Sequence, residues 1–204
     1  TTEETLKEFG TSSRKGTKTQ ASIGLGCLYD VMNRMILESD CRRCKFDEMR
    51  LAEEQLDRVP ETIGSSQPFL AVMDRGYPST AAFIRMMEKG ILFLARLKSS
   101  DYKKEQAALS VSDTWVDIHL DKSRIRRYKG TDIGRRMEEL GHITLRMVKV
   151  PLPGEREETL ITNLPTETFD CRQIAELYHM RWGIETAYET LKDRLQIENF
   201  TGTK

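Results

Sequence analysis

The chain has 204 residues, of which 31% are charged and 38% are hydrophobic, and these proportions are typical of a soluble globular protein rather than a disordered one. Its 32 basic and 32 acidic residues cancel, which argues against a protein that coats nucleic acid through net charge alone. No apolar run approaches the ~20 residues needed to cross a bilayer, so we expect no membrane segment.

The first part of the chain is predicted to form two strands and a helix. Residues 1–19 are polar and rich in Thr, Ser, Lys and Gly, which predicts a loop. Apolar residues gather in Ala21–Val31, and this segment predicts a strand that lies beside a second one at Arg34–Ser39. The apolar spacing of Phe46–Val59 fits one face of a helix, which we expect Pro60 to end.

Two short apolar runs follow, Phe69–Met73 and Ile91–Leu97, and both are typical of strands buried on two faces of a sheet. Ser79 is a suitable N-cap for a helix between them that runs to about Lys89. A strand–helix–strand unit of this kind predicts a sheet with helices on its faces.

Beyond residue 98 the apolar runs become shorter. Residues 99–159 show alternating patterns such as Thr114–Leu120, which predict a β-rich insertion. Leu160–Leu164 is again typical of a buried strand, and Asp170–Leu195 predicts one long helix. The order of elements predicts an α/β protein with a mixed sheet and flanking helices.

Basic residues gather in one stretch of the insertion. Between Lys122 and Arg136 there are seven basic residues and one acid, and seven minus one leaves +6 over these positions. Such a run is either a solvated charged face or a surface that contacts phosphates, and the run alone does not decide between them.

The cysteines do not predict a zinc site. Cys41 and Cys44 form a single C-x-x-C, and no second pair lies at zinc spacing nearby. We interpret all four cysteines as thiols of a reduced cytoplasmic protein.

Asp74 is the first candidate for a functional residue. It follows the apolar run Phe69–Met73 directly, and the Gly-containing turn Arg75–Pro78 comes next. Open α/β sheets bind ligands outside the carboxyl ends of their strands. The alternative is an Asp that only caps the turn or the next helix.

Four polar residues of the last predicted helix form the second candidate site. On an ideal helix, Tyr178, Arg181, Glu185 and Lys192 lie within an arc of about 60° and along about 21 Å. A solvent-exposed face with an ordinary Arg181–Glu185 ion pair would explain any two of them.

The spacing of these four residues, Y-x2-R-x3-E-x6-K, is the signature of the insertion-sequence-four group of DDE transposases, and the chain resembles this Tn-five-like group. The turn Asp74–Tyr77 is similar to the group's second acidic block, and Cys27–Val31 is similar to its second strand. The resemblance covers nearly the whole chain. It implies a ribonuclease-H-like core in residues 1–98 and 160–204, interrupted by the insertion at 99–159.

The resemblance also implies a metal-dependent reaction on DNA. In such transposases two divalent ions, Mg²⁺ or Mn²⁺ as its substitute, assist in-line attack at phosphorus by water and then by a 3′-hydroxyl. These hard cations prefer oxygen ligands, so the resemblance assigns the metal and the catalysis to Asp74 and Glu185.

DNA contacts are implied for other residues. Arg181 and Lys192 would hold phosphates and Tyr178 would add a contact, while the DNA backbone would bind to Arg124, Arg126 and Arg127. We expect Trp115 to pack in the core, with stacking on an unpaired base as the alternative. The implied partners are transposon ends and target DNA, bound by a homodimer at the bacterial nucleoid in the cytoplasm.

One part of the group's pattern is absent. Its first catalytic Asp lies on a strand that precedes the residues opening this chain, and Asp30 and Asp40 fall after the expected position. Since Thr1 follows no initiator Met, we expect an excerpt of a longer protein, and we expect this chain alone to be inactive. The alternatives are a DNA-binding or dimerising remnant, and an unrelated nuclease of the same fold that does not join DNA ends.

Overall fold

The computed structural model describes residues 3–12, 19–64, 67–152 and 156–195. The chain divides into two compact units, of which one comprises residues 1–67 and 182–204 and the other residues 68–181. Among the described helices, none is long and apolar enough to cross a membrane.

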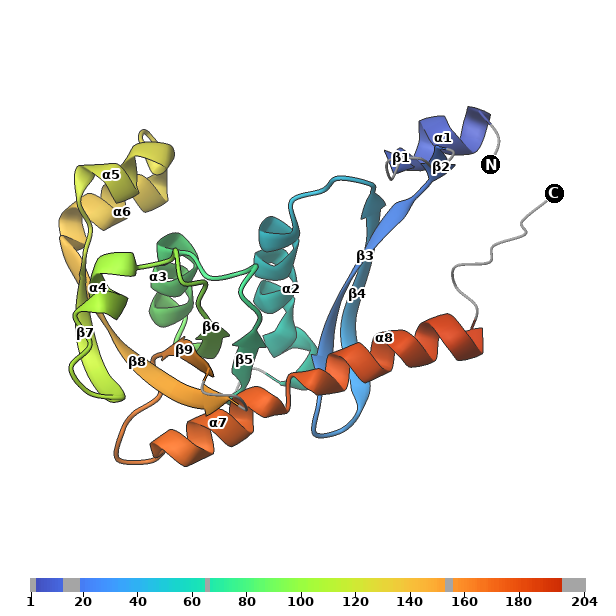
Figure 1. The fold of residues 1–204 in the computed structure, drawn as a ribbon. Helices are drawn as coiled ribbons and strands as arrows, with labels where there is room; N and C mark the ends of the chain where they lie inside the picture. Colours follow the sequence, from blue (N-terminus) through green and yellow to red (C-terminus); the bar gives the residue numbers. More distant parts are fainter. Residues whose placement is uncertain (1–2, 13–18, 65–66, 153–155, 196–204) are drawn as a thin grey trace. The chain divides into compact units, whose positions relative to one another are not determined.

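The first unit is built on an antiparallel hairpin (Figure 1). Strand β3 (Ile23–Asp30) pairs with β4 (Met35–Arg43), which confirms the two strands expected here. The unit also contains α1 (Glu3–Phe9), β1 (Thr11–Ser12), β2 (Gln20–Ala21), α2 (Glu48–Ile63) and α8 (Trp182–Leu195).

Two glycines of β3 allow a close approach of α2 and of Phe46, which precedes the helix. A Cβ at Gly26 would stand 2.5 Å from Cδ2 of Leu51, and a Cβ at Gly24 would overlap the ring of Phe46. Gln55 of α2 is buried and donates a hydrogen bond to the Gly26 carbonyl at 2.9 Å. The close approach of the helix explains why glycines interrupt an otherwise apolar strand.

The expectation that Pro60 ends this helix was wrong. Helix α2 continues through Pro60 to Ile63 and ends before Gly64, whose φ is +96°. A proline removes its own amide donor, but the residues after it still donate to earlier carbonyls, so a helix can continue for most of a turn. The glycine with positive φ then ends it.

Helix α1 lies in a segment that was expected to be a loop. It has no buried residue, and backbone carbonyls attach it to the end of β4. The Phe9 carbonyl accepts a bond from the Cys44 amide at 2.9 Å, and the Lys7 carbonyl accepts one from Arg43 Nη2 at 2.9 Å. The sequence of α1 has two apolar residues, Leu6 and Phe9, which is too short a pattern to predict a helix from periodicity.

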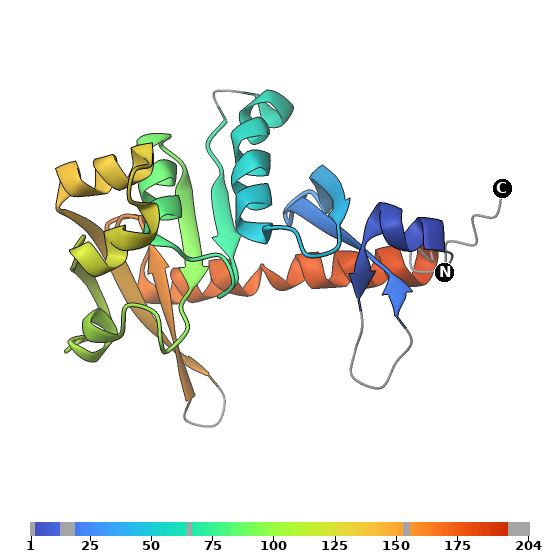
Figure 2. The ribbon, with the colours of Figure 1, turned by 90° about the horizontal axis from the view of Figure 1, so that it is seen from above.

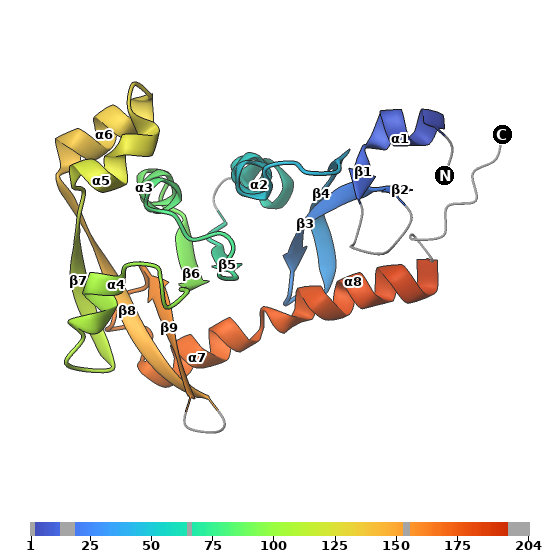
Figure 3. The same ribbon diagram turned by 45° about the horizontal axis from the view of Figure 1, so that its top comes forward.

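The second unit is a five-stranded mixed sheet with helices on both faces, and the expected fold class is confirmed (Figures 1 and 3). Its order is β5-β6-β9-β8-β7, in which β5 and β6 are parallel and the other neighbours are antiparallel. Strands β8 and β9 are antiparallel neighbours, and Leu152 at the end of β8 pairs with Arg156 at the start of β9 (Figure 2). The strands are β5 (Leu70–Met73), β6 (Leu92–Arg96), β7 (Asp113–His119), β8 (His142–Leu152) and β9 (Arg156–Thr162).

Helices α3 (Thr80–Glu88) and α7 (Cys171–His179) cover opposite faces of this sheet (Figure 3). Phe83 of α3 stacks on Phe93 of β6, with 4.7 Å between the ring centroids. The next residue of β6, Leu94, points to the other face and joins a buried cluster with Ile174 of α7. The sheet therefore has an apolar core on each side.

Strands β7 and β8 come from residues 99–159 and join the same sheet through β9. Trp115 on β7 is 42% exposed, so the expectation that it packs in the core was wrong. An edge strand has only one neighbour, which leaves room for an exposed aromatic ring. The segment also contains elements that its alternating pattern did not indicate: α4 (Lys103–Ala107), α5 (Lys122–Ile125), the 3₁₀ helix η1 (Arg126–Tyr128) and α6 (Asp132–Leu140).

The expectation of one helix over Asp170–Leu195 was also wrong. Helix α7 ends at His179 and α8 begins at Trp182, and the Arg181 amide bonds to the carbonyl three residues before it rather than four. Gly183, in the first turn of α8, has a low helix propensity. Tyr178 therefore lies on α7 and Arg181 between the two helices, while Glu185 and Lys192 lie on α8.

Candidate active site

Asp74 follows β5 at its carboxyl end, as the sequence predicts. Its Oδ1 accepts a bond from the Arg75 amide at 2.7 Å, within a turn that the Tyr77 amide closes on the Asp74 carbonyl at 3.1 Å. Helix α3 has a cap of its own, because the Ser79 hydroxyl accepts a bond from the Ala82 amide at 3.1 Å. Asp74 therefore holds the turn but does not cap the helix.

The guanidinium of Arg96 forms an ion pair with the Asp74 carboxylate. Its Nη2 is 2.9 Å and its Nε 3.1 Å from Oδ1, while its Nη1 is 3.3 Å from Oε2 of Glu158. Parallel pairing places Met73 level with Ala95, so the next residues along β5 and β6 meet at one edge of the sheet. Sequence reasoning missed Arg96 and Glu158; the available signal was a single charged residue inside the apolar run of β6.

Tyr178 reaches the same carboxylate from α7. Its hydroxyl lies 3.3 Å from Oδ1 of Asp74, and its ring is 4% exposed. Burial raises the pKa of Tyr178 to about 12, and the negative charge of Asp74 acts in the same direction. The phenol is therefore protonated at neutral pH and donates its proton to the hydrogen bond with Asp74.

Arg181 belongs to the same group of side chains. Its guanidinium carbon lies 5.7 Å from the centroid of the Tyr178 ring. Burial opposes the ionisation of Asp74, but the Arg75 amide favours the carboxylate form. The charges of Arg96 and Arg181 and the Tyr178 hydroxyl also favour it, so the pKa of Asp74 lies below its ordinary value of 3.8. Asp74 is thus a carboxylate at neutral pH.

The second oxygen of Asp74 suits a hard cation. In the part of the chain that the structure describes, all hydrogen bonds and ion pairs of this carboxylate engage Oδ1. Oδ2 is therefore available as the oxygen ligand that Mg²⁺ prefers. No three His, Cys, Asp or Glu side chains among the described residues stand together as a metal site, and all four cysteines are free thiols. Asp74 thus fits one ligand position of a divalent-cation site.

The two remaining signature residues lie on α8, in the first unit. Glu185 is half-buried in the first turn of the helix, and Lys192 is exposed near its end. Within that unit the Tyr188 hydroxyl donates to the Leu25 carbonyl at 3.4 Å, so that α8 packs on β3. The two residues are about two turns apart on this helix.

Asp30 and Asp40, the acids near predicted strand ends, have structural partners. Asp30 accepts bonds from the Met32 and Asn33 amides in the hairpin turn, at 2.9 and 3.0 Å. Asp40 lies within β4 and pairs with Arg58 of α2 at 2.5 Å. Both acids therefore stabilise the first unit.

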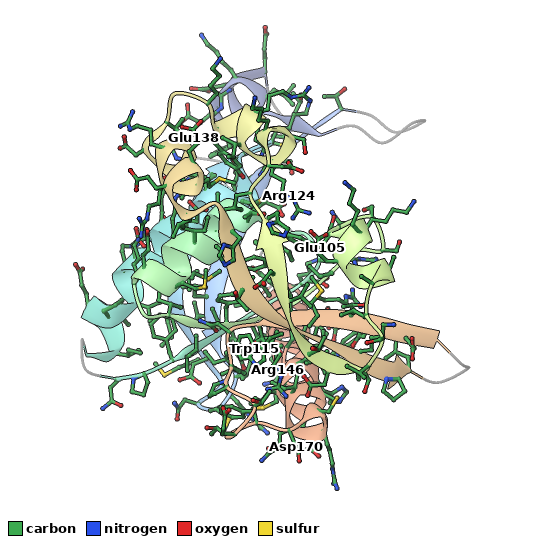
Figure 4. All side chains as sticks on the ribbon, turned by 90° about the vertical axis from the view of Figure 1, so that its left-hand side faces the viewer. Glu105, Trp115, Arg124, Glu138, Arg146 and Asp170 are labelled. Atoms are coloured by element: carbon green, nitrogen blue, oxygen red, sulfur yellow. The ribbon has the colours of Figure 1, made fainter. Side chains whose placement is uncertain are left out.

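The basic stretch of residues 122–136 forms α5, η1 and part of α6. Arg124 Nη2 lies 2.6 Å from Oε1 of Glu105, and its guanidinium carbon is 5.1 Å from the centroid of the Tyr102 ring (Figure 4). Arg126 is exposed, and Arg127 lies over the ring of the next residue at 4.7 Å. Arg135 and Arg136 also pair with acids. The positive charge that remains for a ligand is therefore smaller than the count of +6 indicates.

Comparison with known proteins places the chain in a family. Its whole sequence, residues 1–204, matches the family model described as Transposase DDE domain. No curated protein sequence matches it. DDE transposases carry out phosphoryl transfer on DNA with the help of divalent metal ions, and the ionised Asp74 at a strand end suits that chemistry. The chain therefore belongs to the transposase DDE domain family, and its function is that of a transposase.

Proposed function

We propose that the chain is the catalytic domain of a transposase of the insertion-sequence-four group, which cleaves and joins DNA strands in cut-and-paste transposition. The observation that carries the proposal is the contact between Tyr178 and Asp74, at 3.3 Å, with the charge of Arg181 beside them. Tyr178 of the proposed signature thus contacts the Asp of the proposed second acidic block, and Arg181 lies beside the Tyr178 ring. The proposed core spans residues 1–98 and 160–204, around an insertion at 99–159.

Asp74 and Glu185 are the proposed ligands of Mg²⁺, for which Mn²⁺ can substitute. When bound, the cations supply Lewis acidity at the phosphate that is attacked. Asp74 is ready for this role because its low pKa keeps it ionised. Tyr178 and Arg96 hold Oδ1 and so orient Oδ2. A carboxylate held on one side loses little freedom when its other oxygen binds a cation.

DNA phosphates are the proposed ligands of the cationic residues. The forked guanidinium of Arg181 and the amine of Lys192 suit phosphates beside the cleaved bond, and Tyr178 would add a contact there. Along the insertion the backbone would meet Arg124, Arg126 and Arg127. Since a transposon has two ends, we propose a homodimer that assembles on DNA at the bacterial nucleoid.

Cleavage by site variants tests the proposal. The complete protein and its Asp74→Ala and Glu185→Ala variants are incubated with Mg²⁺ and a plasmid that carries the sequences flanking the gene. We expect both variants to lose cleavage and strand transfer while their DNA affinity stays within about threefold of wild type, because the carboxylates bind metal and not phosphate. Matched controls are Asp117→Ala and Glu189→Ala, which remove exposed acids from the same two units.

Retained cleavage in either site variant would contradict the proposal. DNA binding by the wild type that is equal with and without Mg²⁺, and that never leads to cleavage, favours the alternative of an inactive DNA-binding or dimerising protein. Cleavage without joining favours a nuclease of the same fold.

A further inference from the structure

Arg146 of β8 is a charged side chain inside the core of the second unit. It is 1% exposed, and it is the largest fully buried side chain among the described residues. Its Nε donates to Oδ1 of Asp113 at 2.7 Å, and its Nη2 to Oδ2 at 2.6 Å. Asp113 begins β7, so this two-pronged ion pair links β8 to the edge strand beside it.

The third nitrogen of Arg146 binds the backbone of a loop. Nη1 donates to the carbonyl oxygens of Phe169 at 2.7 Å, Pro165 at 3.3 Å and Leu164 at 3.4 Å. These carbonyls belong to the connection between β9 and α7, and Figure 4 shows Arg146 between the sheet and Asp170 at the start of the helix. One guanidinium therefore attaches this connection to β8 and, through Asp113, to β7.

The connection determines where α7 begins. Asp170 caps the helix by accepting a bond from the Gln173 amide at 2.8 Å, and the Gln173 side chain accepts one from the Asp170 amide at 2.9 Å. Phe169, whose carbonyl Arg146 binds, packs against the same buried cluster as Ile174. The first turn of α7 is thus fixed by its cap and by the residue just before it.

The far end of α7 carries Tyr178, which contacts Asp74, and Arg181 follows two residues after the helix ends. Tyr178 lies eight positions after Asp170, which is about 12 Å of helix. A tilt of about 5° at the start of the helix would move the Tyr178 end by about 1 Å. The Tyr178 hydroxyl would then leave its 3.3 Å contact with Asp74, and Arg181 would move with it.

We propose that Arg146, held by Asp113, is a positioning residue for the transposase site: it fixes the start of α7 and thereby keeps Tyr178 and Arg181 at Asp74. The inference rests on the proposed function. A buried ion pair adds little stability over apolar residues of similar volume, so energy alone does not explain this arginine. Its fork reaches a carboxylate and three carbonyls at once, which the single ammonium of a lysine does not do.

The substitution Arg146→Lys tests this role in the complete protein, because it keeps the charge and removes the fork. We expect kcat for strand cleavage to fall about 10- to 100-fold, the loss expected for a displacement near 1 Å, with DNA affinity unchanged. The matched control is Arg58→Lys, which removes another fork that binds two acids, Glu38 and Asp40, in the first unit. Both variants are also compared in thermal unfolding, and only Arg146→Lys should lower kcat beyond the loss of folded protein.

A second readout does not depend on activity. The protein is labelled with 3-fluorotyrosine, and the ¹⁹F resonance of Tyr178 is assigned with the Tyr178→Phe variant. Arg146→Lys should shift this resonance at neutral pH, because the hydroxyl leaves Asp74, whereas Arg58→Lys should leave it in place. If Arg146→Lys does not fold, Asp113→Asn replaces it, since Arg146 then keeps its bonds to the three carbonyls and a smaller shift is expected.

The two readouts separate this inference from the proposed function. A wild type that does not cleave DNA overturns the proposed function, and the Tyr178 resonance still decides whether Arg146 positions α7. An unchanged resonance in folded Arg146→Lys, or a wild-type kcat in that variant, overturns the positioning role.

Discussion

The hydroxyl of Tyr178 lies 3.3 Å from Oδ1 of Asp74 and joins two segments that are 104 residues apart in sequence. One segment is the turn after β5 and the other is the end of α7. Because Tyr178 is also part of the buried cluster on that face of the sheet, the packing of α7 and the orientation of Asp74 depend on the same side chain. A change in either is therefore expected to affect the other.

Removal of the hydroxyl alone should have a small effect on stability. We expect Tyr178→Phe to lower the free energy of unfolding by about 1 kcal/mol, because the ring stays packed and one hydrogen bond is lost. Tyr178→Ala should cost about 3–5 kcal/mol, since it also leaves a cavity. Urea denaturation of the two variants measures the difference. Equal losses would show that the ring does not contribute to the core.

Tyr178→Phe should also change the ionisation of Asp74. The Tyr178 hydroxyl favours the carboxylate form, so the pKa of Asp74 should be higher in Tyr178→Phe than in the wild type. Carboxyl ¹³C shifts followed through a pH titration measure this pKa, with Asp121 as an internal control on another element. A pKa that stays the same in the variant would contradict the bond between Tyr178 and Asp74.

Acid should remove the stabilisation that ionised Asp74 contributes. The pKa of Asp74 is lower in the folded chain than its ordinary value of 3.8, so the unfolded chain binds the proton more readily. This contribution is complete above that value and is lost as the pH falls through the lower, folded pKa. The stability advantage of the wild type over Asp74→Asn should therefore be constant from pH 7 to about pH 4 and should shrink below it. Denaturation of both proteins across this range is the measurement, and an advantage that grew with acid would contradict the assignment.

The exposed and the paired arginines of the insertion should behave differently. In fluorescence-anisotropy titrations of a DNA duplex, Arg126→Gln should reduce the slope of log Kd against log salt by about 0.9, the value for one phosphate contact. Arg124→Gln should reduce the salt slope as well and should also lower the free energy of unfolding by about 1–3 kcal/mol. The loss of stability is expected because Glu105, whose side chain is 11% exposed, loses its partner. An unchanged salt slope in Arg126→Gln would remove this residue from the proposed DNA surface.

Several parts of the site could be predicted because their signals are local. The apolar runs of β5 and β6 and the cap at Ser79 each depend on a few adjacent residues. The position of Asp74 at a strand end follows from the first of these. By contrast, the break between α7 and α8 was not visible, because the apolar spacing continues through it.

Arg96 and Glu158 show what lay beyond the sequence. Arg96 meets Asp74 because β6 is parallel to β5, and it meets Glu158 because β9 pairs with the other edge of β6. Neither register can be read from periodicity, since Arg96 lies 22 positions from Asp74 and 62 positions from Glu158 in the sequence. The sequence by itself determined the strands of the central sheet, the acidic turn and the spacing of Tyr178, Arg181, Glu185 and Lys192, because each depends on residues close together in the sequence. Only the tertiary structure decided which charges meet, because partners are chosen by long-range pairing of strands and by the packing of α7.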